Sequence, residues 1–169
     1  MSAPLPLLLG GTELIGWRID ASQFAATWDS GEGSYRFGGR WSGQGTRAVY
    51  CALDPSTTIL EVAVHRSFKR LDTVAHTLTS LRVLDPDDVY VVRAETLPNS
   101  NWLRPGIPSA GQQDYGTSLL GDHPFVLVPS VISPNSWNLI FIAANAVGRY
   151  TVRAQEAFAL DTRLHPPTP

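Results

Sequence analysis

Glu61 is the acidic side chain of this sequence whose surroundings most resemble those of a catalytic carboxylate. Its neighbours between Ile59 and Val64 are all apolar. A carboxylate in this setting is costly to bury unless a cation or hydrogen-bond donors meet it, and functional carboxylates are often placed in this way. Glu61 could therefore stabilise a developing positive charge or bind sugar hydroxyls. The alternative is a structural carboxylate paired with Arg40 or Arg18, and the local sequence leaves both open.

Two arginines are candidates for binding an anion. Arg40 follows Gly38 and Gly39. Glycines allow a close approach of the backbone, and a neighbouring guanidinium can fork onto phosphate or carboxylate oxygens. The alternative for Arg40 is a turn arginine that pairs with a surface acid. Arg18 lies in an apolar segment beside Trp17, where it could bind an anion or lie on the surface along the indole ring.

Tyr50 and Ser130 complete the set of candidates, each with a structural alternative. Tyr50 ends a strand-like segment, and its ring could stack on a planar ligand or fill the core with its hydroxyl bonded to the backbone. Ser130 follows Pro129, where its hydroxyl could bind a ligand or cap a turn.

The motifs of several other enzyme classes are absent from the sequence. There is no G-x-S-x-G of a serine hydrolase, no phosphate-binding loop ending in Gly-Lys-Ser/Thr, and no G-x-G-x-x-G between a strand and a helix. The four histidines are dispersed and form no H-E-x-x-H motif, and Cys51 is the single cysteine. The sequence therefore predicts no metal site and no bound prosthetic group.

Length and charge narrow the class of protein further. A chain of 169 residues is long enough for one core and short for two, so we expect one domain. The formal net charge of −2 gives no reason to expect direct nucleic-acid binding. The apolar run at residues 4–9 is too short to span a membrane and no basic residue precedes it. One cysteine suits a reducing compartment, so we expect a soluble, cytoplasmic protein without membrane contact.

The elements that must position these residues interleave helical and strand signals. Asp54 followed by Pro55 predicts an N-cap and the first turn of the helix that carries Glu61. A short helix is expected at residues 20–28, with Phe24 and Trp28 on one buried face. Residues 97–116 are rich in Pro, Asn, Ser and Gly and predict a long loop or lid.

Runs of β-branched and aromatic residues predict the strands. They lie at residues 15–19, 47–52, 78–84, 89–94, 125–128, 138–144 and 158–164. No regular alternation of strand and helix is present, so the fold class is mixed α+β. We expect a lead at residues 1–14, a single domain at 15–164 and a tail at 165–169.

Several blocks of the sequence, in this order, resemble the RES domain, a family named for its Arg, Glu and Ser. The blocks are Trp17-Arg18, Gly38-Gly39-Arg40-Trp41, Ala48-Val49-Tyr50, Leu60-Glu61-Val62-Ala63-Val64-His65, Val128-Pro129-Ser130 with Asn138, and Phe158-Ala159-Leu160-Asp161-Thr162-Arg163-Leu164. The likeness spans nearly the whole chain. The sequence departs from the family downstream of Asn138, where residues 144–147 replace the Asn-Pro and His of many members.

The resemblance implies a fold similar to the diphtheria-toxin type of ADP-ribosyltransferase, with small mixed sheets and flanking helices. It also implies a bacterial toxin that cleaves the nicotinamide–ribose bond of NAD+ as its substrate. Its partner would be an antitoxin with an Xre-like helix-turn-helix region, and a dimer within the complex is a possible assembly. Transfer of ADP-ribose to a protein target, or nucleotide binding without catalysis, are the alternatives.

The resemblance also assigns roles to the candidate residues. Glu61, Arg40 and Tyr50 would be catalytic, with Glu61 acting at the ribose. Arg18 and Arg40 would hold the pyrophosphate, and Tyr50 would pack on the nicotinamide side. Ser130 and Asn138 would complete the NAD+ pocket.

Overall fold

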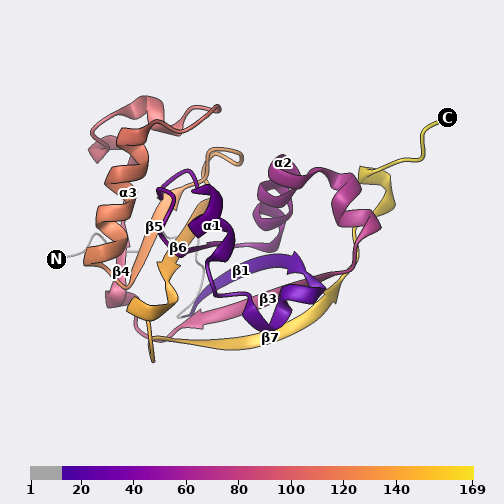
Figure 1. Cartoon of the computed structure of the whole chain (residues 1–169), viewed down its shortest axis with the longest axis horizontal. Coiled ribbons are helices and arrows are strands. Elements are labelled where there is room, and N and C mark those ends of the chain that lie inside the picture. Colours follow the sequence, from indigo (N-terminus) through magenta and orange to yellow (C-terminus); the bar gives the residue numbers. More distant parts are fainter. Residues whose placement is uncertain (1–12) are drawn as a thin grey trace.

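The computed structural model describes residues 13–169, which fold into a single α+β domain around a mixed sheet (Figure 1). The strand order is β4-β5-β6-β2-β1-β3-β7. The strands are β1 (Leu14–Ala21), β2 (Ala48–Ala52), β3 (His76–Val83), β4 (Val89–Val91), β5 (Phe125–Pro129), β6 (Trp137–Ile142) and β7 (Tyr150–Phe158). Strands β4 and β5 are parallel and the other neighbours are antiparallel. The expected class, α+β with a mixed sheet and flanking helices, is confirmed.

The sheet consists of two halves that meet at a narrow seam. Strands β1 and β2 pair at Trp17 and Ala52 alone, whereas β1 pairs with β3 along its whole length. Gly16 lies at this seam, and a Cβ atom there would stand 3.3 Å from side-chain atoms of Cys51, Leu139 and Leu81. That spacing is tighter than ordinary van der Waals contact, so the absence of a side chain lets the two halves approach each other.

In the part of the chain that the structure describes, three α-helices pack around the sheet (Figure 1). They are α1 (Glu32–Phe37), α2 (Pro55–Thr73) and α3 (Ala110–Asp122). Helix α2 begins where the sequence predicts, because the Asp54 carboxylate accepts the backbone N–H of Thr57 at 2.7 Å and Pro55 opens the first turn. Helix α3 is capped in the same way by Ser109, whose hydroxyl accepts the N–H of Gln112 at 3.2 Å.

Short 3-10 helices link these elements. They are Ser22–Thr27, Pro86–Asp88, Ala94–Thr96, Ser100–Leu103, Ala143–Asn145 and Thr162–Leu164. The first replaces the helix expected at residues 20–28. Trp28 is buried as predicted, but Phe24 is 52% exposed, so the predicted apolar face is wrong for Phe24. A 3-10 helix has three residues per turn, which does not align residues four apart.

The core is divided because strand β5 is buried on both faces. Phe125 and Leu127 pack with Leu139 and Phe141 in one cluster, whereas Val126 and Val128 pack in another with Trp41. Alternate residues of a strand point to opposite faces, so one strand serves both clusters. A third cluster, formed by Ile19, Leu71 and Leu160, lies where the C-terminal part of α2 packs on β1.

Two sequence predictions are wrong in this part of the chain. Residues 97–116 are not all loop, because α3 already begins at Ala110. Its glycines and polar residues hide the helical pattern, and packing stabilises it instead. The final strand is β7, which shares only Phe158 with the expected strand at 158–164. Most of β7 is exposed at a sheet edge, and residues 150–155 do alternate between apolar and polar, a strand signal that the prediction at 158–164 did not use.

The sequence predictions for the N-terminus fall largely outside the described residues. Most of the expected lead at 1–14, and the apolar run at 4–9, belong to the part that the structure does not describe. Within residues 13–169, no helix combines the length and the apolar character needed to cross a membrane.

Helix α2 contains a sharp break at Ser67, whose backbone has φ 68° and ψ 156°. This region of backbone space is occupied almost exclusively by glycine, and a residue with a side chain is strained there by about 1–3 kcal/mol. Ser67 is exposed, so its side chain contributes little packing to offset the strain. The break turns the last part of α2 toward the C-terminal segment, where His165 lies 2.8 Å from the Asp72 carboxylate.

We expect Ser67→Gly to raise the free energy of unfolding by about 1 kcal/mol, because glycine adopts this backbone conformation without strain. Urea unfolding would measure the change. Ser56→Gly is the matched control: Ser56 is exposed in the regular part of the same helix, so the glycine should lower stability by about 0.5 kcal/mol. Equal effects of the two substitutions would contradict strain at Ser67.

Candidate functional site

The carboxylate of Glu61 on α2 is held by two side chains from the β5–β6 region of the sheet. Its Oε1 accepts a hydrogen bond from Ser130 Oγ at 3.0 Å and another from Asn138 Nδ2 at 2.8 Å. Glu61 is partly buried, and neither Arg18 nor Arg40 forms a salt bridge with it. The structure thus brings together three of the predicted site residues, and hydrogen-bond donors rather than a cation meet the carboxylate.

The strands and helix that carry these residues explain why they meet. Asn138 on β6 pairs with Val128 on β5, which places Asn138 beside the end of β5 from which Ser130 continues. On α2, the hydroxyl of Thr58 donates to the Trp17 carbonyl at 3.1 Å and fixes that helix face on β1. Glu61 lies three residues further along and therefore on the same face.

Ser130 caps a turn, as one of its two predicted roles requires, and its contact with a ligand stays a prediction. Its hydroxyl accepts the backbone N–H of Ser133 at 3.1 Å, which caps the turn after β5. The same hydroxyl donates to Glu61. Because Ser130 is only 5% exposed, the turn fixes the direction of the donated hydrogen bond.

Asn138 must present its amide nitrogen to Glu61, because an ionised carboxylate only accepts hydrogen bonds. Its other polar atom, Oδ1, is buried and has no hydrogen-bond partner among the described residues. The observed contact of Asn138 is therefore with Glu61. Its contact with a substrate stays a prediction.

All three nitrogens of the Arg18 guanidinium donate hydrogen bonds to other groups of the protein. Nε and Nη2 donate to the two oxygens of Asp20 at 2.9 and 2.8 Å, and Nη1 donates to the Tyr50 carbonyl at 3.0 Å. The side chain remains 29% exposed. Three of its five N–H groups are used in this way, which leaves two for a ligand.

Arg40 is held by backbone oxygens rather than by a carboxylate. Nη2 donates to the Gly106 carbonyl at 2.7 Å, and Nη1 makes longer contacts of 3.4 and 3.5 Å with the carbonyls of Trp102 and Arg104. Burial lowers the pKa of Arg40, and the charge of Glu61 opposes that shift. Arg40 and Glu61 therefore lie within electrostatic reach of each other without forming an ion pair.

Tyr50 supports the backbone on both sides of Arg40. Its hydroxyl accepts the N–H of Trp41 at 3.0 Å and lies 2.8 Å from Ser42 Oγ. A Cβ atom on Gly39 would stand 2.5 Å from the same hydroxyl, so only glycine fits there. Burial raises the pKa of Tyr50 from its ordinary 10 to about 12, so the hydroxyl stays protonated well into the alkaline range. Stacking of its ring on nicotinamide stays a prediction.

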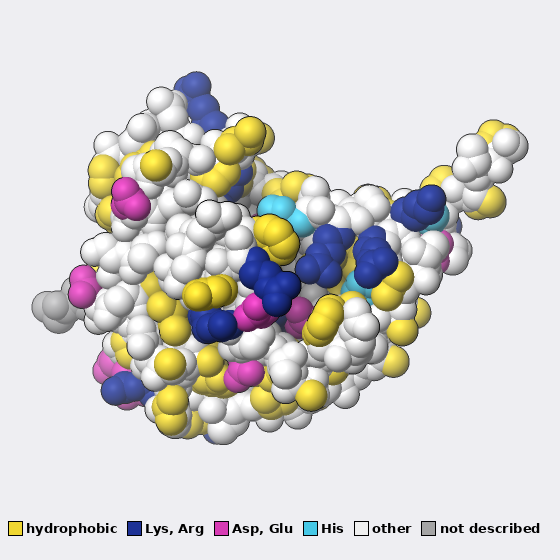
Figure 2. Space-filling view, in the orientation of Figure 1, with side chains coloured by type: hydrophobic (Ala, Val, Ile, Leu, Met, Phe, Trp, Pro, Cys, Tyr) yellow, Lys and Arg dark blue, Asp and Glu magenta, His cyan; other side chains and the backbone are white. Residues whose placement is uncertain are grey.

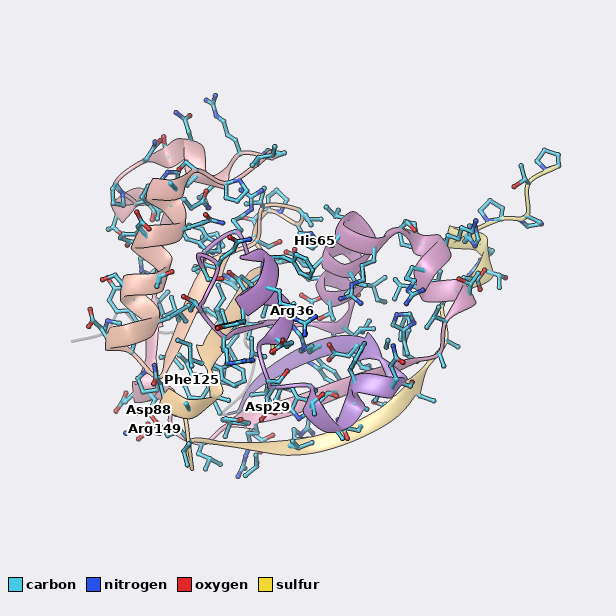
Figure 3. All side chains as sticks on the ribbon, viewed as in Figure 1. Asp29, Arg36, His65, Asp88, Phe125 and Arg149 are labelled. Carbon is cyan, nitrogen blue, oxygen red and sulfur yellow. The ribbon has the colours of Figure 1, made fainter. Side chains whose placement is uncertain are left out.

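The predicted residues form two adjoining groups. One is Glu61 with Ser130 and Asn138, and the other is Arg18 with Tyr50 and the turn that carries Arg40. Arg36 on α1 and His65 on α2 mark the two helices in Figure 3. Figure 2 shows basic, acidic and apolar side chains gathered on the face between these helices.

A separate hollow of about 510 Å³ shares none of these residues. It is lined by Asp29, Ala143, Ala144, Val147, Gly148, Tyr150 and Val152. The Tyr150 hydroxyl donates to Asp29 at 2.6 Å, and burial and this acceptor raise the Tyr150 pKa. The ionisable side chains that line the hollow, Asp29 and Tyr150, are hydrogen-bonded to each other. We therefore assign the candidate active site to the group around Glu61.

Sequence reasoning missed the residues of α3 that hold the arginine turn, which we define as residues 38–43. Gln113 Nε2 donates to the Gly39 carbonyl at 2.8 Å, and Thr117 Oγ1 accepts the Gly43 N–H at 3.1 Å. Residues 113 and 117 are four apart and so lie on the same face of α3. Ser109, followed three residues later by Gln112, is a helix-start signal that could have predicted α3 from the sequence.

The fold and the site together define an α+β protein that fixes a carboxylate within electrostatic reach of Arg40. The chain belongs to the RES domain family, whose model matches residues 15–161. It is 32% identical over 160 residues to "Toxin Res" of Photorhabdus laumondii, covering 89% of this chain and 97% of that protein. A second "Toxin Res", from Yersinia enterocolitica, is 28% identical over 144 residues, covering 83% of this chain and 91% of that protein.

A solved structure supports the same fold. The chain superposes with a TM-score of 0.70 on one from the crystal structure of the M. tuberculosis MbcT–MbcA toxin–antitoxin complex. The two chains are 22% identical, and the match covers 87% of this chain and 85% of the other. At this identity the likeness concerns the fold.

We expect Tyr50→Phe to lower the free energy of unfolding by about 1–3 kcal/mol, because it leaves the Trp41 N–H and the buried Ser42 hydroxyl without their partner. Urea unfolding at neutral pH would measure this. Tyr35→Phe is the control, since Tyr35 is 44% exposed and its change should stay within about 0.5 kcal/mol. A Tyr50→Phe variant as stable as the control would show that the hydroxyl does not hold the turn.

Alkaline pH should destabilise the protein through acids with raised pKa values, among them Tyr50 and Cys51. Burial raises the pKa of Tyr50 from its ordinary 10 to about 12 and that of Cys51 from 9 to about 12. Between these values the unfolded chain has released protons that the folded chain retains, so stability falls as pH rises. The contribution is fully present below about pH 9 and is lost by about pH 12.

Urea unfolding at a series of pH values from about 8 to about 11 would measure this loss. The decline should be shallower in Tyr50→Phe, which lacks the Tyr50 contribution but retains those of Cys51 and Tyr150. A stability that stays constant over this range would contradict the burial of both groups.

Proposed function

We propose that this protein is the toxin of a toxin–antitoxin pair and that it cleaves the nicotinamide–ribose bond of NAD+. The observation that carries the proposal is the Glu61 carboxylate, fixed by Ser130 and Asn138 within electrostatic reach of Arg40. Family membership and relatives named as toxins support the biological role.

The chemistry of the bond explains why one carboxylate suffices. Cleavage gives the ribose oxocarbenium character at the transition state, as in glycoside hydrolysis. Nicotinamide leaves as a neutral molecule, so no general acid is needed. Glu61 Oε1 is occupied by its two donors, whereas Oε2 accepts no hydrogen bond from the described residues. Oε2 would accept from a ribose hydroxyl while the carboxylate charge stabilises the developing cation.

The two arginines would hold the pyrophosphate of NAD+ with different strengths. Arg40 would exchange its long contacts with neutral carbonyls for phosphate oxygens, which form stronger, charge-assisted hydrogen bonds. Arg18 retains two N–H groups, but Asp20 already neutralises its charge. The larger share of pyrophosphate binding therefore falls to Arg40, and both residues would position the ribose at Glu61.

The proposal includes an antitoxin partner and action on the cytoplasmic NAD+ pool. The structural neighbour comes from a toxin–antitoxin complex, which supports a protein partner for this chain as well. An Xre-like helix-turn-helix region in that partner would supply the DNA binding for which this chain, at a net charge of −2, has no basic excess.

Glu61→Gln should reduce nicotinamide release from NAD+ by at least about 100-fold, because it removes the charge that stabilises the transition state. The amide oxygen of glutamine can still accept from Ser130 and Asn138, so the fold should be retained. Chromatographic quantification of nicotinamide would follow the reaction. Glu95→Gln is the control, since Glu95 is exposed and lies outside the site.

Three conditions separate the possible acceptors. Release without phosphate indicates hydrolysis, release that requires phosphate indicates phosphorolysis, and labelling of a lysate protein from biotinylated NAD+ indicates ADP-ribosyl transfer. Wild-type turnover in Glu61→Gln would refute the role of this residue. Tight NAD+ binding with no release under any condition would refute catalysis and leave a nucleotide-binding module.

A further inference from the structure

Helix α3 makes a set of contacts with the arginine turn that the reaction outlined above does not use. Gln113, Gly116 and Thr117 share one face of the helix, at the i, i+3 and i+4 spacing. Gln113 donates to the Gly39 carbonyl at 2.8 Å, and Thr117 accepts from the Gly43 N–H at 3.1 Å. A helix that was expected to be part of a loop thus contacts both ends of the turn.

Gly116 allows this helix to lie directly against the turn. A Cβ atom at position 116 would stand 2.0 Å from the Trp41 carbonyl oxygen, which is a severe overlap with backbone. Trp41 is itself 2% exposed and packs edge-on against Trp102 at 6.4 Å. The turn and the helix therefore form one packed unit, and a small side chain cannot be inserted between them.

Gln113 acts on the peptide group that leads into Arg40. The carbonyl of Gly39 and the N–H of Arg40 belong to one planar unit, so fixing one fixes the other. Gly38 has φ 71° and Gly39 also lacks a side chain, so the backbone alone restricts this segment weakly. Hydrogen bonds supply the restriction instead: the Gly39 N–H donates to the Ser42 carbonyl at 2.9 Å and its carbonyl accepts from Gln113.

We infer that Gln113 is a positioning residue that fixes the Gly39–Arg40 peptide and so aims the Arg40 guanidinium toward the substrate pyrophosphate. The same helix also orders the other side of this guanidinium. Gln112 is 1% exposed and donates to the Trp102 carbonyl at 3.2 Å, one of the oxygens that Arg40 contacts. This inference rests on the pyrophosphate role given to Arg40 in the proposed function.

The test measures binding of ADP-ribose, which carries the pyrophosphate without the scissile bond, by isothermal titration calorimetry. Gln113→Ala removes the donor, and Gln113→Glu keeps the shape but places a carboxylate against the Gly39 carbonyl. Both variants should bind ADP-ribose about tenfold more weakly, the usual effect of one lost hydrogen bond. Asp114→Ala, an exposed change on the next residue, should bind as the wild type does.

A double-mutant cycle separates positioning from a general loss of structure. Arg40→Ala alone should weaken binding, and adding Gln113→Ala to it should cause no further loss, because Gln113 acts through Arg40. In turnover, Gln113→Ala should raise KM for NAD+ more than it lowers kcat. Wild-type affinity in Gln113→Ala, or an equal loss with and without Arg40, would overturn the inference.

Hydrogen exchange keeps this inference separate from the proposed function. If the wild type binds no ADP-ribose and releases no nicotinamide, the proposed function fails. The effect on the turn is still measured by amide exchange in peptides that cover residues 38–43. Exchange should be faster there in Gln113→Ala than in Asp114→Ala. Equal rates in the two variants would show that Gln113 does not fix the turn.

Discussion

The placement of one carboxylate organises the centre of this protein. Glu61 lies on an apolar helix face, and Ser130 and Asn138 donate to a single one of its oxygens. This arrangement satisfies part of the carboxylate without neutralising it, since both donors are uncharged. The donors follow from the register of β5 and β6, and the acceptor follows from the start of α2 at Asp54. The site therefore depends on long-range pairing as well as on local sequence.

The seam between the two halves of the sheet gives Arg18 a structural role beside any role in binding. The β1–β2 ladder ends after a single pair, so the Tyr50 carbonyl lacks a ladder partner from β1. The Arg18 guanidinium supplies that hydrogen bond across the seam, and Asp20 holds the side chain in place. Backbone acceptors buried at such a junction need a partner, which a long side chain can provide. Arg18 thereby couples β1 to the strand that supports the arginine turn.

Local signals in the sequence were sufficient for some elements and insufficient for others. The Asp54-Pro55 cap fixed the start of α2, and apolar runs located β1, β2, β5 and β6 to within a few residues. Glu61, Ser130 and Asn138 were all found as candidates, but the hydrogen bonds between them could not be predicted, because 69 and 77 positions separate Glu61 from its two donors. Helix α3 was missed because its stability comes from packing and not from an apolar pattern. Strand β7 was missed although residues 150–155 alternate between apolar and polar, because the prediction placed the last strand at the run that begins at Phe158.

The two arginines differ in whether a carboxylate already compensates their positive charge, and this difference decides how strongly each can bind an anion. Arg18 faces a carboxylate in bidentate geometry, so its positive charge is already compensated. Arg40 donates to carbonyls of residues 102–106 and forms no ion pair with a described residue, and burial disfavours its charged form. A partly buried guanidinium without a described counter-ion gains more from an arriving anion than one that already has a counter-ion. Since Glu61 is too far to form an ion pair with Arg40, an anionic group between them would be attracted by one and oriented away from the other. Under the proposed function, that polarity would favour a phosphate at the arginine and an electron-poor ribose at the carboxylate.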